Sequence, residues 1–375
     1  MKKVLFIQLI GNSYGGVWQV IKMVGEQLIK EGYEVSIVSG HNIYKAIDKD
    51  KFDVHPIWIT NEGYFANEEE SFKVLEDPSY QVKNPHKVHN ISNLIELENL
   101  PEIDVFFPIV HGNLGEDGVL QGLFRLMNKP FVGDDVLAAA VTMDKEFTKI
   151  LAQKVGVPVA DWISIKRFEY DDKNNDKLDY EKVAEKLGRD MFVKPSNQGS
   201  SVGVNHVTNA DEYAAALEEA FKYDDKVLVE ETVPGTEVET AVLGNDKPIV
   251  AGVGQITNAK GSFYTYENKY DDNSTSKLQI PADLPDEIID TVRKNARKVY
   301  EVTECSGMAR IDSMLTPGGK VVLTEVNALP GFTNISMYPK LFEEAGIPYT
   351  ELITRLIEAG MERFDHKKTL LHKHD

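Results

Sequence analysis

Lys194 stands shortly before a loop that is rich in glycine and serine, Gly199-Ser200-Ser201-Val202-Gly203. Glycine lets the backbone approach a ligand closely, so the N–H groups of such a loop can surround phosphate oxygens. Lys145 and Lys194 would add point charges of the sign that phosphate needs. The alternative is a plain turn between two strands. Because the chain has no Gly-x-x-x-x-Gly-Lys-Ser/Thr motif, a nucleotide would have to be held by a fold other than that of the P-loop proteins.

A second set combines two carboxylates with an amide. Asp312 lies on one predicted strand, and Glu325 and Asn327 lie two residues apart on the next, so the latter pair faces one side. Oxygen ligands of this kind suit magnesium, which proteins often share with nucleotide phosphates. A solvated hairpin face is the alternative. The apolar flanks, however, indicate core strands, where a buried carboxylate is costly unless it is paired or binds a metal. Arg310 could stabilise a developing negative charge or simply neutralise Asp312.

A third candidate is the segment 330–337, PGFTNISM. A Pro-Gly turn followed by hydroxyl residues can aim N–H groups and a serine at an anion. A turn that leads into a helix explains the same residues, and the sequence leaves both interpretations open.

Apolar patterning predicts the elements that position these residues. In the first part of the chain we expect a parallel α/β arrangement. Its strands are predicted at 4–10, 35–38, 53–59 and 104–110, and its helices at 17–30, from residue 43, and near 90–98.

Further along the chain, strands at 191–194 and 226–230 flank the glycine-rich loop and a helix at 211–221. Residues 237–256 alternate as strands do, and Pro317-Gly318-Gly319 predicts a hairpin of strands 308–315 and 321–326. Helices are expected at 138–155, 286–302 and 345–361. The polar, tyrosine-rich segment 258–276 is typical of a mobile loop over a site, and 365–375 of a frayed tail.

Composition limits the class of protein. The chain has 375 residues with a net charge of −19, which argues against nucleic acid or an anionic membrane as the partner. Local lysines can still hold phosphate in an acidic protein. The one cysteine, Cys305, excludes an internal disulfide and favours a reducing compartment. The opening Met1-Lys2-Lys3 and its short apolar run lack a cleavage site, and no apolar stretch reaches the ~18 residues of a membrane span. We therefore expect a soluble, cytoplasmic protein.

Set in order, these segments resemble the D-alanine–D-alanine ligases of the ATP-grasp superfamily, from about residue 41 to about residue 360. The motifs that carry the resemblance are HGNLGEDG at 111–118 with Gln121-Gly122, MDK at 143–145 with Thr148-Lys149, VKPSNQGSSVG at 193–203, ENKY at 267–270, GMARID at 307–312, EVNALPGFT at 325–333 and SMYP at 336–339. Each could arise by chance alone, but their common order and spacing make coincidence an inadequate explanation.

The resemblance implies a three-domain α/β fold of the ATP-grasp type, opened by a parallel, Rossmann-like domain. We place the domains at 1–135, 136–235 and 236–365, followed by a tail at 366–375, with ATP between the second and third. It also implies a homodimer and an activity in peptidoglycan precursor synthesis. In that reaction ATP and two D-alanine molecules give D-alanyl-D-alanine, ADP and phosphate through D-alanyl phosphate.

The resemblance also implies roles for the nucleotide-binding residues. Lys145 and Lys194 correspond to phosphate-binding lysines, and Ser200, Ser201 and Gly203 to the phosphate loop. Glu230 and Glu237 correspond to acids on the adenine and ribose sides. Asp312, Glu325 and Asn327 correspond to the ligands of two Mg²⁺ or Mn²⁺ ions. Lys269 and Tyr270 lie on a loop that closes over the reaction, where Tyr270 meets Ser200.

Other implied roles concern D-alanine. Arg310 and the Gly331 N–H would form an oxyanion site, and Ser336 and Met337 would receive the carboxylate of the second D-alanine. His111 would lie near the first D-alanine. No role follows for a nucleic acid or a membrane.

The opening of the chain departs from the family pattern, Gly-Gly-x-Ser-x-Glu-x-Glu-Val-Ser, whose first glutamate anchors the amino group of the first D-alanine. Depending on the alignment, Gly15 or Gly32 takes its place, with Glu31 and Glu34 as substitutes. The first ~40 residues instead resemble the first strand, loop and helix of a two-domain nucleotide-sugar glycosyltransferase. We expect an exchanged segment that leaves ATP binding intact and alters the first substrate subsite.

Four hypotheses follow. The chain could be an active D-alanine–D-alanine ligase, or a relative that takes D-lactate or D-serine as its second substrate. Lys269-Tyr270 favours the dipeptide, because depsipeptide-forming relatives usually depart from it. A nucleotide-binding protein without catalysis is the third possibility, and a catalytically impaired first subsite would explain it. A glycosyltransferase is the fourth, but it gives no role to Asp312, Glu325 or Asn327.

Overall fold

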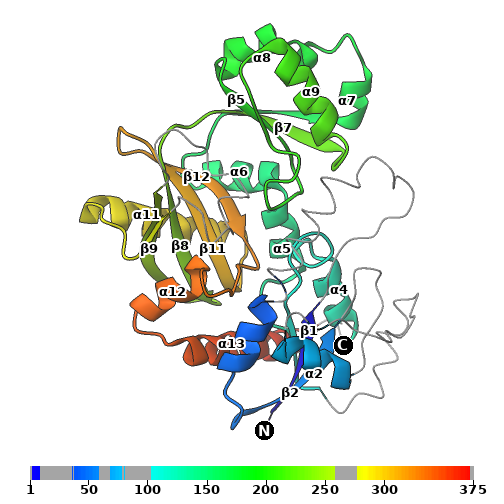
Figure 1. Ribbon diagram of the computed structural model, residues 1–375, viewed down its shortest axis with the longest axis vertical. Helices are drawn as coiled ribbons and strands as arrows, with labels where there is room; N and C mark the ends of the chain where they lie inside the picture. The colour runs from blue at the N-terminus through cyan, green and yellow to red at the C-terminus, as the bar shows by residue number, and fades with distance from the viewer. Residues whose placement is uncertain are drawn as a thin grey trace.

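The computed structural model describes residues 2–8, 36, 38–58, 68–77, 80, 103–257 and 277–371. Within these ranges it contains three β-sheets, each formed by strands from one part of the chain. Figure 1 shows them one above another along the long axis, with the last-numbered strands in the middle.

The first sheet is parallel, as the sequence predicts. Its order is β2-β1-β3, formed by β1 (Lys2–Gln8), β2 (Phe52–Trp58) and β3 (Val105–Pro108). β3 is buried along its whole length, which is typical of a strand covered on both faces. The helices α2 (Glu68–Glu76) and α4 (Val119–Leu126) lie beside this sheet (Figure 1).

The predicted strand at 35–38 is wrong, because Ser36 and residues 38–46 are helical. The buried positions are Ser36, Ser39, Gly40, Ile43 and Ile47, which repeat with the period of a helix. Three of these five carry small side chains, so the apolar residues that suggested a strand do not mark the buried face.

A four-stranded antiparallel sheet carries the glycine-rich loop. Its order is β4-β7-β5-β6, formed by β4 (Trp162–Lys166), β7 (Lys226–Glu231), β5 (Met191–Pro195) and β6 (Asn205–Val207). Its helices are α7 (Arg167–Asp171), η2 (Asp176–Leu178), α8 (Tyr180–Leu187) and α9 (Ala210–Ala220). Figure 1 shows α8 and α9 over one face, so the opposite face is turned toward the middle sheet.

The middle sheet is antiparallel, in the order β10-β9-β8-β11-β12. Its strands are β8 (Thr236–Gly244), β9 (Ile249–Thr257), β10 (Lys277–Gln279), β11 (Gly307–Leu315) and β12 (Val321–Asn327). The hairpin of β11 and β12 confirms the prediction. The later helices are α11 (Asp286–Val302), α12 (Met337–Glu344) and α13 (Tyr349–Lys368).

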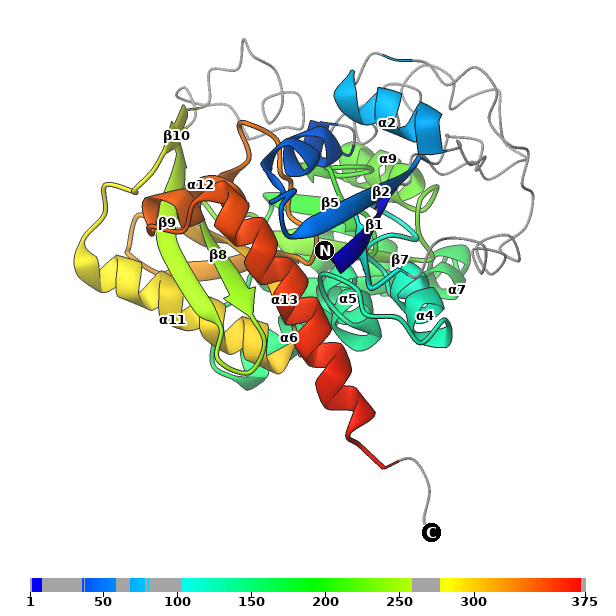
Figure 2. The same ribbon diagram turned by 90° about the horizontal axis from the view of Figure 1, so that it is seen from below.

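The two faces of this sheet pack against different helices. Ala241, Leu243 and Met308 share a core with residues of α12 and α13, which Figure 2 shows on one side of β8 and β9. The alternate residues Val242 and Ala309 share another core with residues of α11. Because strand side chains alternate, Glu237, Glu239, Arg310 and Asp312 lie on the α12 side.

Two helix predictions need correction. The helix expected at 138–155 is two helices, α5 (Val136–Met143) and α6 (Lys145–Lys154), because the Asp144 side chain caps α6 by accepting the Glu146 and Phe147 N–H groups. The helix expected at 345–361 begins at Tyr349 and continues to Lys368, into the segment expected to be a frayed tail. The predicted helices at 17–30 and 90–98 and the loop at 258–276 lie outside the described residues.

Over the described part of the chain, no helix combines the length and the apolar character that crossing a membrane requires.

Candidate active site

A buried group of lysines surrounds one carboxylate between the four-stranded sheet and α6. Lys194 Nζ on β5 lies 2.8 Å from Glu230 Oε2 on β7, and Lys149 Nζ on α6 lies 3.3 Å from Glu230 Oε1. Burial alone would raise the pKa of Glu230, but the two ammonium groups outweigh it and lower the pKa. We call Lys145, Lys149, Lys194 and Glu230 the lysine cluster. Its positive charges outnumber the carboxylate, which suits an anionic ligand.

Lys145 connects this cluster to the other candidate segments. It is the first residue of α6, and its ammonium donates a hydrogen bond to the carbonyl of Gln198, just before the glycine-rich loop. Burial lowers the pKa of Lys145, whereas the nearby carboxylates of Glu325 and Glu230 act in the opposite direction. Lys145 therefore lies within electrostatic reach of both the four-stranded sheet and the middle sheet.

The glycine-rich loop is more tightly shaped than a plain turn. Ser200 and Ser201 have φ values of 52° and 59°, in the left-handed region that non-glycine residues seldom adopt. The start of the loop is held by Asp224, whose Oδ2 accepts the Asn197 N–H at 2.7 Å. At Gly203 a Cβ atom would approach a neighbouring ring carbon to 2.8 Å, so a side chain would not fit there. Strained backbone of this kind is often retained at ligand sites.

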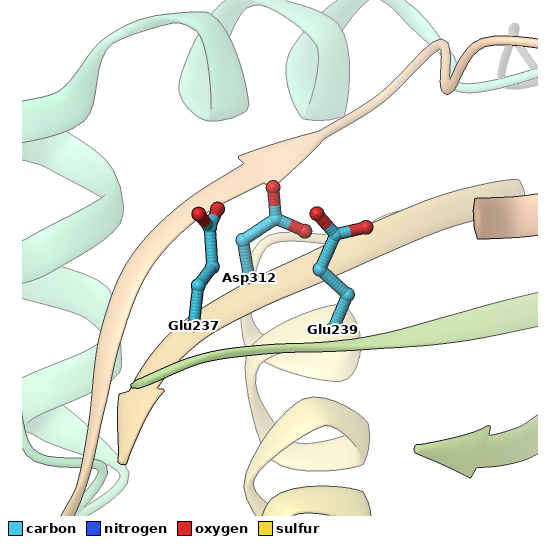
Figure 3. A group of neighbouring side chains, drawn as sticks. All are labelled: Glu237, Glu239 and Asp312. Atoms are coloured by element: carbon cyan, nitrogen blue, oxygen red, sulfur yellow. The ribbon is translucent and has the colours of Figure 1, made fainter. Parts of the chain in front are cut away.

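Four carboxylates gather on the α12 side of the middle sheet. Asp312 on β11 pairs with Glu239 on β8 and with Glu325 on β12, and Glu237 precedes Glu239 on the same side of β8. One oxygen each of Glu237, Glu239 and Asp312 lie within 4.8 Å of one another. Figure 3 shows these three side chains projecting to the same side of the two strands. We call Glu237, Glu239, Asp312 and Glu325 the acidic face.

Arg310 and Asn327 hold Asp312 in place. Arg310 donates through Nε and Nη2 to the two Asp312 oxygens, at 2.8 and 2.7 Å, and its Nε lies 2.9 Å from Glu239 Oε2. Asn327 Nδ2 donates to Asp312 Oδ2 at 2.9 Å. Arg310 therefore neutralises Asp312, one of the two roles that the sequence allowed. The predicted metal ligands Asp312, Glu325 and Asn327 lie together.

The chemistry of the acidic face fits a divalent cation. Asp312 and Glu239 are almost completely buried, and ionised acids in such positions need positive charge nearby. Arg310 pairs with those two, while Glu237 and Glu325 add further negative charge. Several carboxylate oxygens within a few ångströms match the preference of magnesium for oxygen ligands.

The segment 330–337 is both a turn and the start of a helix. Its backbone is held by the helix of residues 38–46, because Ser39 Oγ accepts the Phe332 N–H and Asn42 Nδ2 donates to the Phe332 carbonyl, each at 3.0 Å. Ser336 Oγ accepts the Thr333 N–H at 2.9 Å, and α12 begins at Met337. Gly331 precedes these fixed residues, so its N–H has a defined position.

The loop after β3 carries His111 and Glu116. His111 Nδ1 lies 3.3 Å from Ser36 Oγ, and burial lowers the His111 pKa to about 4, so the ring is neutral near pH 7. Burial, reinforced by the charge of Glu325, raises the pKa of Glu116 to about 7, and its carboxylate accepts the Gly112 N–H. This loop therefore lies near the acidic face.

The sequence analysis assigned no role to Glu239, Lys149 or Glu116. Glu239 shares the strand alternation of Glu237, and Lys149 follows Lys145 by one helical turn, so both had a readable signal. Glu116 lies within the HGNLGEDG motif. Lys269 and Tyr270, predicted on the closing loop, lie outside the described residues.

Comparison with known families places the chain. The family model described as D-ala D-ala ligase C-terminus matches residues 151–358, and the model described as D-ala D-ala ligase N-terminus matches residues 31–134. This chain belongs to the D-alanine–D-alanine ligase family. Residues 1–30 lie outside both matches, in agreement with the predicted atypical opening, although the family pattern begins earlier than residue 41.

Individual relatives agree with the family. A Lactobacillus helveticus protein named D-alanine–D-alanine ligase is 96% identical over 343 residues, covering 92% of this chain and 95% of the relative. The crystal structure of the VanG D-Ala:D-Ser ligase from Enterococcus faecalis is 33% identical, with a TM-score of 0.76 over 96% of this chain and 99% of that one. The crystal structure of a Bacillus anthracis D-alanine–D-alanine ligase complexed with ATP is 25% identical, with a TM-score of 0.71 over 98% of this chain and 100% of that one. The α/β ATP-grasp fold that the sequence predicted is thereby confirmed.

Proposed function

We propose that this chain is an ATP-dependent D-alanine–D-alanine ligase that supplies a peptidoglycan precursor. The observation that carries the proposal is that Lys145, a member of the lysine cluster, also lies within electrostatic reach of Glu325 on the acidic face. One group suits phosphate and the other suits a divalent cation, which is the combination that bound ATP requires. The name of the Lactobacillus helveticus relative supports D-alanine as the substrate.

The chemistry joins a carboxylate to an amine, and it needs activation because a carboxylate is a poor electrophile. A carboxylate oxygen of the first D-alanine attacks the γ-phosphorus of ATP, and ADP leaves. The amine of the second D-alanine then attacks the carbonyl carbon of the resulting D-alanyl phosphate. Phosphate leaves with the electron pair of the broken C–O bond, the nitrogen loses a proton, and the amide forms.

We assign the nucleotide to the lysine cluster and the adjoining loop. Lys145 and Lys194 would offset the negative charge of the phosphates. The backbone of Ser200, Ser201 and Gly203 would surround the phosphate oxygens. Glu230 and Glu237 would lie on the adenine and ribose sides, and Lys269 and Tyr270 would belong to the loop that excludes water, with Tyr270 near Ser200.

Asp312 and Glu325 of the acidic face, together with Asn327, would hold two Mg²⁺ or Mn²⁺ ions. When bound, these ions would neutralise charge on the transferring phosphoryl group.

Arg310 and the Gly331 N–H would stabilise the oxyanion that forms when the amine attacks. Ser336 and the Met337 N–H, at the start of α12, would receive the carboxylate of the second D-alanine. His111 would lie near the first D-alanine. Because its low pKa keeps it neutral, it would act as a hydrogen-bonding group rather than as a cation.

The altered opening supports a second candidate within the same enzyme class. The glutamate expected to anchor the first D-alanine is replaced by Gly15 or Gly32. A ligase with a different first substrate, or an impaired homologue that binds ATP, would have the same lysine cluster and acidic face. A different second substrate is a further alternative within this class, since the VanG relative is named a D-Ala:D-Ser ligase.

We propose domains at 1–135, 136–235 and 236–365 with a tail at 366–375, supported by the one sheet in each of the three domains. A cytoplasmic homodimer without nucleic-acid or membrane partners is the corresponding assembly. Apolar side chains on α4, α5 and α6 support it, since Leu126, Leu137 and Phe147 are 88%, 62% and 53% exposed. Light scattering at several concentrations would measure the mass.

Phosphate release from ATP and Mg²⁺, with and without D-alanine, tests the function when the product is identified by mass. We expect phosphate release that depends on D-alanine, together with D-alanyl-D-alanine. Nucleotide binding without dipeptide would reject this activity, and a screen of first substrates would then test the alternative. D-serine and D-lactate added as competitors would show which second substrate the chain prefers.

A further inference from the structure

Glu239 lies next to Asp312 on the acidic face (Figure 3), and none of the roles assigned so far uses it. It lies on β8 between β9 and β11, with Asp312 as its cross-strand partner on one side and Gly254 on the other. Only 3% of its surface is exposed. A Cβ atom at Gly254 would come within 2.4 Å of Met337 Sδ, so Met337 packs closely over the strand beside Glu239. The backbone and surroundings of Glu239 are therefore fixed.

The guanidinium of Arg310 lies between two carboxylates that can accept from the same donor. Its Nε carries one hydrogen, which it donates to Asp312 Oδ1 at 2.8 Å. Glu239 Oε2 lies 2.9 Å from that same nitrogen. A small rotation of the side chain would transfer the hydrogen bond from Asp312 to Glu239 without moving the backbone.

We propose that Glu239 is a positioning residue that holds Arg310 in place when Asp312 directs its oxygens toward a divalent cation. The inference rests on the proposed function for the part that concerns turnover. Asp312 cannot give the same lone pairs to a metal ion and to Arg310. A cation at Asp312 also repels the guanidinium, so a second carboxylate is needed to keep Arg310 close to the reacting carbonyl.

A competing interpretation makes Glu239 a further metal ligand, since its oxygen lies within 4.8 Å of those of Glu237 and Asp312. The two interpretations differ in what Glu239 acts through. A positioning residue acts through Arg310 and leaves metal affinity nearly unchanged. A ligand acts on the metal and does not depend on Arg310.

The test compares E239Q, E239D, R310K and the double variant E239Q/R310K with the wild type. We expect E239Q to lower kcat by about 10- to 100-fold, as is common when a partner that orients a functional residue is lost. We expect the KM for ATP and the affinity for Mn²⁺ with ADP, measured by electron paramagnetic resonance, to change less than threefold. E239D should recover part of kcat, and the double variant should be no slower than R310K.

Several outcomes would overturn the proposal. A wild-type kcat in E239Q would show that Glu239 does not position Arg310. A fall in Mn²⁺ affinity parallel to kcat would make Glu239 a ligand, and multiplying effects in the double variant would show that it acts independently of Arg310. Loss of the folded state in E239Q together with full activity in E239D would make its role structural.

A second measurement does not depend on turnover. The Arg310 Nε–H signal, assigned from its absence in R310K, can be followed by nuclear magnetic resonance as Mg²⁺ and ADP are added. We expect the signal to persist in the wild type and to broaden through solvent exchange in E239Q. Equal behaviour of the two proteins would contradict the proposal. If the wild type made no dipeptide, only the proposed function would fail, because this measurement would still decide the role of Glu239.

Discussion

The lysine cluster and the acidic face bury charge in opposite ways. In the first, Lys145, Lys149 and Lys194 surround Glu230. In the second, Arg310 pairs with Glu239 and Asp312, and Glu237 and Glu325 lie beside them on the neighbouring strands. Buried ion pairs seldom stabilise a fold more than apolar packing would, so two such buried groups need another explanation. A ligand that brings phosphates to the lysines and a divalent cation to the carboxylates would complement both groups.

The pKa values in the lysine cluster reflect both burial and the charges of the neighbouring groups. Burial lowers the pKa of Lys149, whereas its neighbours lower that of Glu230 despite burial. A bound phosphate would relieve the repulsion among the lysines. We therefore expect different effects on catalysis and on nucleotide binding when one charge is removed from each group.

The largest effect is expected from D312N on the acidic face. The amide cannot replace the carboxylate toward a cation, and it removes one of the two carboxylates that pair with Arg310, leaving Glu239. We expect kcat to fall by about 100-fold or more, since the loss of a direct ligand should exceed the 10- to 100-fold typical of its supporting partners. Steady-state phosphate release measures this effect. E301Q, an exposed acid-to-amide change on α11, is the matched control, and equal losses in both variants would refute the assignment.

A smaller loss is expected from K194M in the lysine cluster. Removal of the ammonium takes one charge from the phosphate side and leaves Glu230 with Lys149. We expect the affinity for ADP to weaken by about 10- to 100-fold, as for a charged hydrogen bond of about 1.5–3 kcal/mol. Titration calorimetry measures it, with the exposed-lysine variant K186M as the control. An unchanged affinity in K194M would remove the lysine cluster from the nucleotide site.

Asp134 offers a contrast with Glu230. Both are buried acids, but the pKa of Asp134 is raised whereas that of Glu230 is lowered. Burial raises the Asp134 pKa to about 8. The Ser306 N–H and the charge of Arg363 act in the opposite direction, but their effect is smaller. The folded state thus keeps a proton that the unfolded chain releases near pH 4. The stability from this group is complete below about pH 4 and is lost as pH rises toward 8, by up to about 1.4 kcal/mol per pH unit.

D134N stays neutral at every pH and should flatten that part of the profile. Its amide oxygen can still accept the Ser306 N–H. Urea unfolding at pH 6 and pH 8 measures the difference. The wild type should lose more stability than D134N over this interval, and identical slopes would show that Asp134 is ionised in the folded protein.

The smallest effect is expected from S39A, which touches neither charged group but supports the segment beside Gly331. The variant leaves the Phe332 N–H without the acceptor that it has at 3.0 Å. We expect a loss of about 1–2 kcal/mol in the free energy of unfolding. Urea unfolding measures it, and no change would mean that the segment is held by its other contacts, including Asn42 and Tyr349.

The sequence allowed prediction of the local parts of this arrangement. The turn at Pro317 indicated the hairpin, which brings Asp312 opposite Glu325. The motif around Lys194 indicated the loop. The sequence could not show that β8 lies beside β11, because that pairing joins segments that are distant along the chain. Glu239 was therefore not recognised as a neighbour of Asp312. The helix at 38–46 was misread because small residues, Ser39 and Gly40, occupy its buried face.

The dependence of nucleotide binding on Mg²⁺ tests the complementary roles of the two groups most directly. Titration of ADP into the wild type, D312N and K194M, each with and without Mg²⁺, gives the change in affinity that the metal causes. We predict that Mg²⁺ strengthens binding in the wild type and in K194M, and that D312N loses most of this strengthening while its metal-free affinity stays close to that of the wild type. Strengthening by Mg²⁺ that is unchanged in D312N would contradict the account, because the metal would then act elsewhere than at the acidic face.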